Sequence, residues 1–219
     1  MEIEFQLRRV EVDGVSHRFR LYVPADYDAA VLFLHGAGER GNDSIAPTKV
    51  GLGSALSERE EPFPAIVVFP QCPRETHWTA AAARDIAMAA LDATKKEFRI
   101  ERVALTGISM GAAGAWLMAA EHPERFMSLA PICGWVSARS TKDHADLIAR
   151  IRTIPTWIFH GSVDHIVPVE HSRVMEAALK VAGADVRYTE LRDVAHNSWD
   201  PAYGASNLLE WMLNPSAVR

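Results

Sequence analysis

One short motif constrains the fold of this chain more than any other feature: Gly107-Ile108-Ser109-Met110-Gly111, a serine between two glycines. It lies where an apolar run, 102–106, gives way to the Ala-, Leu- and Met-rich stretch 112–121. These two patterns are typical of a strand and of a helix. So tight a strand-to-helix turn strains the backbone at the serine and leaves no room for flanking side chains. The motif therefore predicts an exposed hydroxyl at the carboxyl edge of a sheet, where the Met110 N–H at the helix start can face an oxyanion.

A serine nucleophile needs a base and an acid, and the sequence offers a candidate for each. Asp164 follows the apolar run 156–160, and His196 follows the run 186–191. Both lie just past the carboxyl end of a predicted strand, where open α/β sheets collect their ligands. Asp193 competes for the role of acid, but it lies three residues from His196 and would have to bend back along its own loop. We therefore expect a triad of Ser109, His196 and Asp164.

The composition is typical of one globular domain that spans residues 1–219. Hydrophobic residues make up 48% and charged residues 23% of the chain, which argues against disorder. No apolar run approaches the about 20 residues of a membrane span. The net charge of -5 argues against nucleic acid or an anionic membrane as a partner. Because the first six residues carry acids where a secretory signal needs a basic patch, the expected compartment is the cytosol.

Alternating strand and helix patterns predict an α/β fold with a mostly parallel sheet of about eight strands and helices on both faces. The first two strands meet across Asp13-Gly14, a strong hairpin signal, and should be antiparallel edge strands. Strands are predicted over 5–10, 16–23, 30–34, 65–69, 102–106, 126–130, 156–159 and 186–191, and helices over 80–96, 112–121, 143–150, 170–182 and 202–212. The connection 131–141 is too short for a lid domain, so an open site is expected.

A glycine-rich loop, His35-Gly36-Ala37-Gly38-Glu39-Arg40-Gly41, follows the third predicted strand. Its glycines allow the N–H of Ala37 to approach a substrate oxygen, as the second half of an oxyanion hole. The same residues satisfy G-x-G-x-x-G, the fingerprint of dinucleotide-binding proteins. That fingerprint needs an apolar helix starting inside the motif, whereas a polar loop continues here. We therefore favour the oxyanion role, with His35 structural and Glu39 and Arg40 near the rim of the site.

Metal and redox chemistry find little support in the sequence. Cys72 and Cys133 lie far apart without zinc-ligand spacing, and both are expected to be reduced structural thiols. His165, Glu170 and His171 are clustered in sequence, but they lie at a strand edge and a helix start, where they would not converge on one ion. No metal site is predicted, and these three residues are expected to form a solvated rim.

A resemblance to a known family extends over nearly the whole chain. It rests on four sequence blocks, 34–41, 69–73, 107–111 and 195–199. The chain resembles small single-domain serine esterases of the α/β-hydrolase superfamily, close to feruloyl esterases and dienelactone-hydrolase-like carboxylesterases. The resemblance implies Ser109 as nucleophile, Asp164 as acid, His196 as base, and the N–H groups of Ala37 and Met110 as oxyanion donors. It implies hydrolysis of a small-molecule ester through an acyl-enzyme, without a metal or organic cofactor.

Two other functions stay open at the level of sequence. The same blocks are similar to the catalytic domain of prolyl-oligopeptidase-like enzymes, although the chain lacks room for the propeller of such peptidases. A hydrolase fold can also lose its chemistry and serve as a binding protein, which an intact set of catalytic residues argues against. Trp78 and Trp199 are the aromatic candidates for substrate contact, and packing is an alternative role for Trp78.

Overall fold

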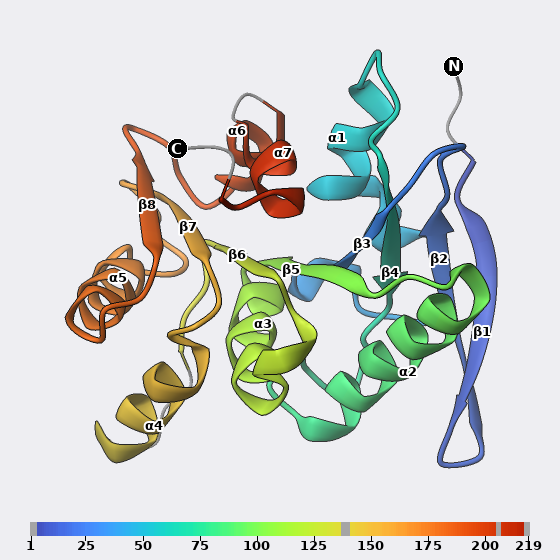
Figure 1. Ribbon diagram of the computed structural model, residues 1–219, viewed down its shortest axis with the longest axis horizontal. Coiled ribbons are helices and arrows are strands. Elements are labelled where there is room, and N and C mark those ends of the chain that lie inside the picture. Colours follow the sequence, from blue (N-terminus) through green and yellow to red (C-terminus); the bar gives the residue numbers. More distant parts are fainter. Residues whose placement is uncertain (1–3, 137–140, 205–206, 217–219) are drawn as a thin grey trace.

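A computed structural model describes residues 4–136, 141–204 and 207–216, and its eight strands form one sheet (Figure 1). The strands are β1 (Gln6–Val12), β2 (Val15–Tyr22), β3 (Ala29–Leu34), β4 (Ala65–Pro70), β5 (Arg102–Ile108), β6 (Ser128–Ile132), β7 (Thr156–Gly161) and β8 (Val186–Leu191). The helices are α1 (Leu52–Glu58), α2 (Ala81–Phe98), α3 (Met110–Glu121), α4 (Thr141–Ile151), α5 (Glu170–Val181), α6 (Trp199–Gly204) and α7 (Leu208–Leu213). Short 3-10 turns cover Ala37–Glu39, Ala46–Lys49 and Pro123–Arg125.

The sheet has the strand order β1-β2-β4-β3-β5-β6-β7-β8. Strands β3 to β8 pair in parallel, while β2 runs antiparallel to both β1 and β4. Asp13 and Gly14 both have positive φ, 51° and 76°, as the two-residue turn between β1 and β2 requires. The predicted class, α/β with a mostly parallel eight-stranded sheet, is confirmed, and the hairpin lies at one edge as expected.

Each face of the sheet has its own hydrophobic core because the central strands are buried on both sides. In β3, Leu32 and Leu34 belong to the core under α2, α3, α4 and α5, whereas Val31 and Phe33 belong to the core under α1, α6 and α7. Figure 1 shows these two helical layers below and above the sheet. Because parallel strands end at the same edge, the loops after β3, β4, β5, β7 and β8 lie together, and these loops carry the predicted site residues.

The C-terminal helix predicted over 202–212 is wrong. The chain instead forms α6 and α7, with Gly204 at the end of α6 and Asn207 as the N-cap residue of α7. The apolar pattern runs through both helices because both bury their faces in the same core. Helix α1 was not predicted from the sequence. The expected absence of a lid over 131–141 falls partly on residues 137–140, which lie outside the described residues.

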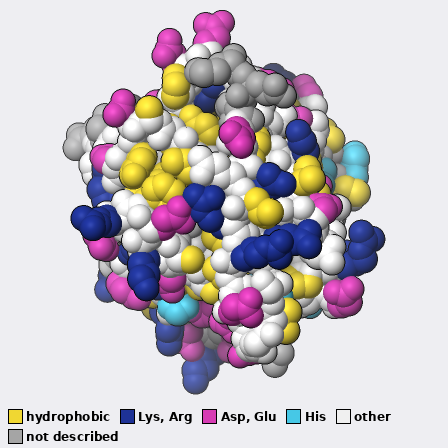
Figure 2. Space-filling view, turned by 90° about the vertical axis from the view of Figure 1, so that its right-hand side faces the viewer, with side chains coloured by type: hydrophobic (Ala, Val, Ile, Leu, Met, Phe, Trp, Pro, Cys, Tyr) yellow, Lys and Arg dark blue, Asp and Glu magenta, His cyan; other side chains and the backbone are white. Residues whose placement is uncertain are grey.

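Charged side chains protect the exposed edge strand β1. Arg8 pairs with Glu97 of α2 at 2.7 Å, while Arg9 and Glu11 lie exposed on the other face. Figure 2, which looks onto this side of the molecule, shows basic and acidic side chains interspersed. Such charges discourage strand pairing with another chain.

Of the helices in the described part of the chain, none is both long and apolar enough to cross a bilayer.

The strand-to-helix turn leaves no space for a β-carbon at Gly111. A Cβ built there would lie 1.9 Å from the carbonyl oxygen of Leu34 and 2.7 Å from that of His35. Replacing Gly111 by alanine should therefore lower the free energy of unfolding in urea by about 3 kcal/mol or more. Gly204→Ala is the matched control, since nothing lies within 4 Å of its added Cβ, and it should change stability by less than about 1 kcal/mol. Equal stability of the two variants would contradict this reading of the turn.

Candidate active site

Ser109 lies on the turn between β5 and α3 in a strained backbone conformation. Its φ is 51° and its ψ is -116°, a combination that residues other than glycine rarely adopt. Its N–H donates to the carbonyl of Ile132 at the end of β6, at 2.9 Å, which holds the turn against the sheet. A Cβ at Gly107 would lie 2.5 Å from the backbone of Gly111. The turn therefore needs both glycines, and it presents the serine side chain above the edge of the sheet.

The three predicted polar side chains form one hydrogen-bonded chain. The hydroxyl oxygen of Ser109 lies 2.9 Å from Nε2 of His196, and Nδ1 of His196 lies 2.7 Å from Oδ2 of Asp164. An Nδ1–H that donates to the carboxylate leaves Nε2 free to accept the serine proton. These distances are within the usual range of hydrogen bonds, so the arrangement can support proton transfer from the serine.

Asp164 is buried and held by several donors. Burial by itself opposes ionisation, but bonds from His196 and from the N–H groups of Val167 and Ile166 outweigh it and lower the pKa of the carboxyl. Oδ1 accepts both backbone bonds, at 2.8 and 2.9 Å, which leaves Oδ2 for the histidine. The carboxylate therefore stays ionised at neutral pH and is available to accept the Nδ1–H of His196.

His160, in β7, is a site residue that the sequence analysis did not identify. Its Nε2 lies 2.9 Å from the carbonyl of Val167 and 3.2 Å from Oδ2 of Asp164, and its Nδ1 lies 2.7 Å from the hydroxyl of Ser172. Burial lowers the pKa of His160, so the ring is neutral, with Nε2–H donating and Nδ1 accepting. The sequence feature that could have indicated this role is a histidine in an apolar strand, four residues before the acid. His160 is placed to position Asp164.

The competing acid, Asp193, makes no contact with His196 that the structure records. Its side chain is 86% exposed and lies 3.8 Å from the guanidinium of Arg192. The N–H of Asp193 donates to the hydroxyl of Ser162 at 2.9 Å. The carboxylate that contacts His196 is that of Asp164.

The glycine-rich loop after β3 is tied to the segment after β4 through His35. Its Nε2 accepts the N–H of Cys72 at 2.9 Å, and the N–H of Gly41 donates to the carbonyl of Cys72 at 2.9 Å. Burial lowers the pKa of His35 to about 4, so the unprotonated Nε2 persists at neutral pH. The ring thus fixes the loop that carries Ala37, a structural role as expected.

A hollow of about 580 Å³ opens beside Ser109 and includes both predicted oxyanion donors, Ala37 and Met110. Met110 is the first residue of α3, where backbone N–H groups have no acceptor within the helix. Its lining includes the polar residues Arg40, His77, Thr79 and His171 and the apolar residues Trp135, Ile166, Val167 and Pro168. Arg40 belongs to this site, as predicted, whereas the contributions of His77, Trp135 and the 166–168 segment were not predicted from the sequence.

The two tryptophans predicted to contact substrate lie in different surroundings. Trp78 is fully buried, its indole N–H donates to the carbonyl of His35 at 3.0 Å, and it packs against Gly114. Substrate contact by Trp78 is therefore wrong, and the alternative packing role fits the structure. Trp199 is partly exposed and packs edge-on against His196, with ring centroids 5.5 Å apart. Substrate contact by Trp199 stays a prediction.

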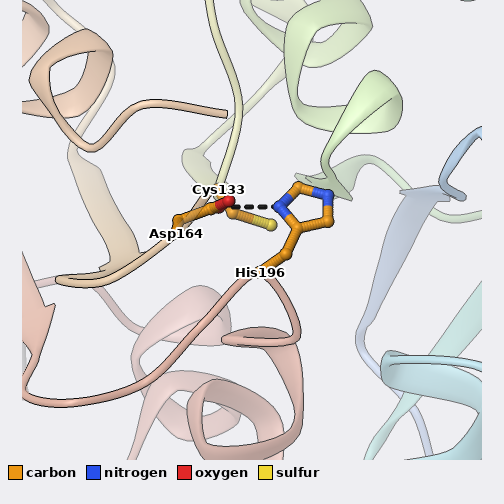
Figure 3. A group of neighbouring side chains, drawn as sticks. All are labelled: Cys133, Asp164 and His196. Carbon is orange, nitrogen blue, oxygen red and sulfur yellow. Dashed lines mark hydrogen bonds and ion pairs between the residues drawn. The ribbon is translucent and has the colours of Figure 1, made fainter. Parts of the chain in front are cut away.

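A thiol lies beside the acid and base. Cys133 Sγ, a carboxylate oxygen of Asp164 and a ring nitrogen of His196 all lie within 4.8 Å of one another (Figure 3). A metal ion would have to displace the Asp164–His196 hydrogen bond and deprotonate the thiol, whose pKa burial raises to about 12. The geometry fits a small side chain packed under the pair better than a metal site. Cys72 and Cys133 are both free and buried, as predicted.

The residues weighed as a metal cluster lie at the surface. His165, Glu170 and His171 are all exposed. His171 lines the hollow beside Ser109, while Glu170 forms an ion pair with Arg173 at 3.1 Å. They form part of a solvated rim.

Comparison with known proteins assigns the chain to a family. The model of a family described as phospholipase/carboxylesterase matches residues 69–204. The chain belongs to this family. A solved structure described as a thermostable esterase is 31% identical, with a TM-score of 0.81 over 95% of this chain and 62% of that one. The predicted resemblance to serine esterases with an α/β-hydrolase fold is confirmed.

Two curated relatives are more distant and longer. An uncharacterized secreted protein of Arthroderma benhamiae is 26% identical over 210 residues, 82% of this chain and 22% of that protein. A putative carboxymethylenebutenolidase of Escherichia coli O157:H7 is 26% identical over 125 residues, 51% of this chain and 46% of that protein. The chain therefore spans less than half the length of each. The cytosolic location of this protein stays a prediction.

The hydrogen-bonded chain predicts which groups activate the serine. A fluorophosphonate probe should label Ser109, because reaction requires a serine whose proton can pass to His196. Asp164→Asn should slow labelling on the order of 10³-fold or more, since the histidine loses its orienting carboxylate. Asp193→Asn is the matched control and should label at the wild-type rate, with peptide mapping by mass spectrometry as the readout. A label on another serine, or equal slowing in both variants, would contradict the assignment.

Proposed function

We propose that the protein is a serine carboxylesterase that hydrolyses short-chain or aryl esters through an acyl-enzyme. The observation that carries the proposal is the hydrogen-bonded series Ser109, His196 and Asp164, whose Ser109 lines the hollow. The family description and the similar thermostable esterase support an ester as substrate. Ala37 and Met110 line the same hollow and are proposed to hold the oxyanion through their N–H groups.

The proposed reaction has two steps. His196 Nε2 takes the proton of Ser109 as Oγ attacks the ester carbonyl carbon, and Asp164 stabilises the imidazolium. The bond to the alcohol oxygen then breaks, and His196 donates its proton to the departing alcohol. In the second step His196 takes a proton from water, whose oxygen attacks the acyl carbon. The bond to Ser109 breaks, the serine regains its proton, and a carboxylic acid leaves.

The nucleophile can be tested directly. Ser109→Ala should remain folded and lose ester hydrolysis on the order of a millionfold, as triad nucleophiles typically do. Initial rates with 4-nitrophenyl butyrate, together with circular dichroism of the variant, measure both properties. Retention of more than about one per cent of wild-type activity in a clean preparation would refute the role of Ser109. A wild-type protein that hydrolyses no ester would favour a binding function instead.

The size of the hollow predicts a preference for short acyl chains. The hollow of about 580 Å³ beside Ser109 must also hold the alcohol part of the ester, and the larger apolar side chains that line it are those of Met110, Trp135, Ile166 and Val167. A long chain would bury only some of its methylenes and gain little of the about 0.8 kcal/mol available for each. Acetyl to butyryl aryl esters should therefore show higher kcat/KM than dodecanoyl esters. Methyl hydroxycinnamates test whether Trp199 supports an aryl acyl group. A kcat/KM that rises steadily past about ten carbons would contradict the short-chain preference.

A further inference from the structure

Arg40 brings a fixed positive charge to the hollow that contains Ser109. It follows the 3-10 turn Ala37–Glu39 and lines the same cavity as the serine. Its Nε donates to the carbonyl of Ala37 at 3.0 Å, and its Nη1 donates to the carbonyls of Arg74 and Thr76 at 3.3 and 3.2 Å. These bonds hold the guanidinium in one orientation, so little side-chain entropy is left to lose when a ligand binds.

The acceptors that hold Arg40 are neutral carbonyl groups. Within the described residues no carboxylate lies at ion-pair distance from its guanidinium, and Nη2 makes no hydrogen bond. The neighbouring Glu39 is turned back towards the backbone of Gly36, with Oε2 3.1 Å from the position of an added Cβ there. Asp43, the next acid along the loop, accepts bonds from the N–H groups of Ile45 and Ala46. The charge of Arg40 is thus not neutralised by the acids of its own loop.

The remainder of the hollow has the same bias. Among its described lining residues none is acidic, and two further nitrogen-bearing rings, His77 and His171, line it. Trp135, Ile166 and Val167 also line the hollow and offer contact to an apolar group. This contrasts with the chain as a whole, whose net charge is -5. An uncompensated cation in an otherwise acid-free cavity favours an anionic ligand, because a planar guanidinium matches a carboxylate.

We propose that Arg40 selects esters that carry a carboxylate in addition to the ester group, with the carboxylate bound at Nη2 and the apolar part against the apolar lining residues. The inference rests on the proposed function and specifies its substrate class. Arg40 is a specificity-determining residue, because it binds the carboxylate of the substrate and takes no part in the transfer of protons or of the acyl group. Its bond to the carbonyl of Ala37 also supports one of the oxyanion donors, so its removal is expected to lower hydrolysis of neutral esters to some extent.

The test compares substrates that differ only in charge. Monoethyl esters of succinic, glutaric and adipic acid are each paired with the corresponding ethyl ester amide, in which a neutral amide replaces the carboxylate. A second arm places the carboxylate in the alcohol part, with butyryl glycolate against butyryl glycolamide. Release of acid in a pH-stat gives kcat/KM for each substrate. The readout is the ratio of carboxylate to amide, which cancels losses that affect all esters equally.

In the wild type, kcat/KM for the carboxylate substrate should exceed that for the amide about tenfold or more in at least one arm. The arm that shows this preference tells whether the carboxylate belongs to the acyl or to the alcohol part of the ester. Raising the salt to 0.5 M should reduce the ratio, because exposed charge pairs are screened. Arg40→Gln should bring the ratio to about one, while Arg40→Lys should keep part of it. The control is Arg74→Gln, which removes an equal charge nearby from a side chain that lines a separate hollow, and it should leave the ratio unchanged.

Each contrary result has a distinct meaning. A wild-type ratio near one in both arms would overturn the inference while leaving the proposed esterase function intact. The same conclusion would follow if Arg40→Gln and Arg74→Gln changed the ratio equally. Hydrolysis of neither member of any pair would refute the proposed function and the inference with it. If Arg40→Gln fails to fold, the wild-type ratio and its salt dependence decide the question.

Discussion

The contact between the first turn of α3 and the end of β3 determines the geometry of the whole site. Gly111 lies so close to the carbonyl of Leu34 that no side chain fits between them. That contact sets the position of Ser109 on one side and the start of the 35–41 loop on the other. The positions of the nucleophile and of the Ala37 loop are therefore fixed relative to each other by backbone contacts. Such contacts deform less than side-chain contacts do. The strain at Ser109 persists because the surrounding structure holds it.

The acid and base depend on a second set of bonds at the ends of β7 and β8. Asp164 receives two backbone N–H groups at Oδ1 and two histidines at Oδ2. His160 is buried and neutral, so it fixes the carboxylate without adding a charge that would compete with His196. An ionised carboxylate in a buried position needs this many donors, since each offsets part of the cost of removing it from water. The orientation of His196 follows from where Asp164 is held.

Arg40 connects the architecture of the site to its chemistry. The same guanidinium that ties the Ala37 loop to the 74–76 segment contributes a positive charge to the hollow. His35 and Gly41 bind the other end of that loop to Cys72. The blocks 34–41 and 69–73, which are distant in sequence, thus form one structural unit. The position of the charge in the hollow is a consequence of how this unit is held.

The sequence by itself determined which strands and turns carry the site residues and the order in which these residues follow along the chain. Local glycine spacing predicted the turn at Ser109, and strand periodicity predicted that Asp164 and His196 follow β7 and β8, because both are properties of short segments. Tertiary structure decided what depends on burial and on distant neighbours. It left Asp193 exposed, buried Trp78 against Gly114, brought His160 to 3.2 Å from Asp164, and divided the C-terminal helix into α6 and α7. A side chain's exposure and its partners across the sheet are set by how the layers pack, and no local pattern contains that information.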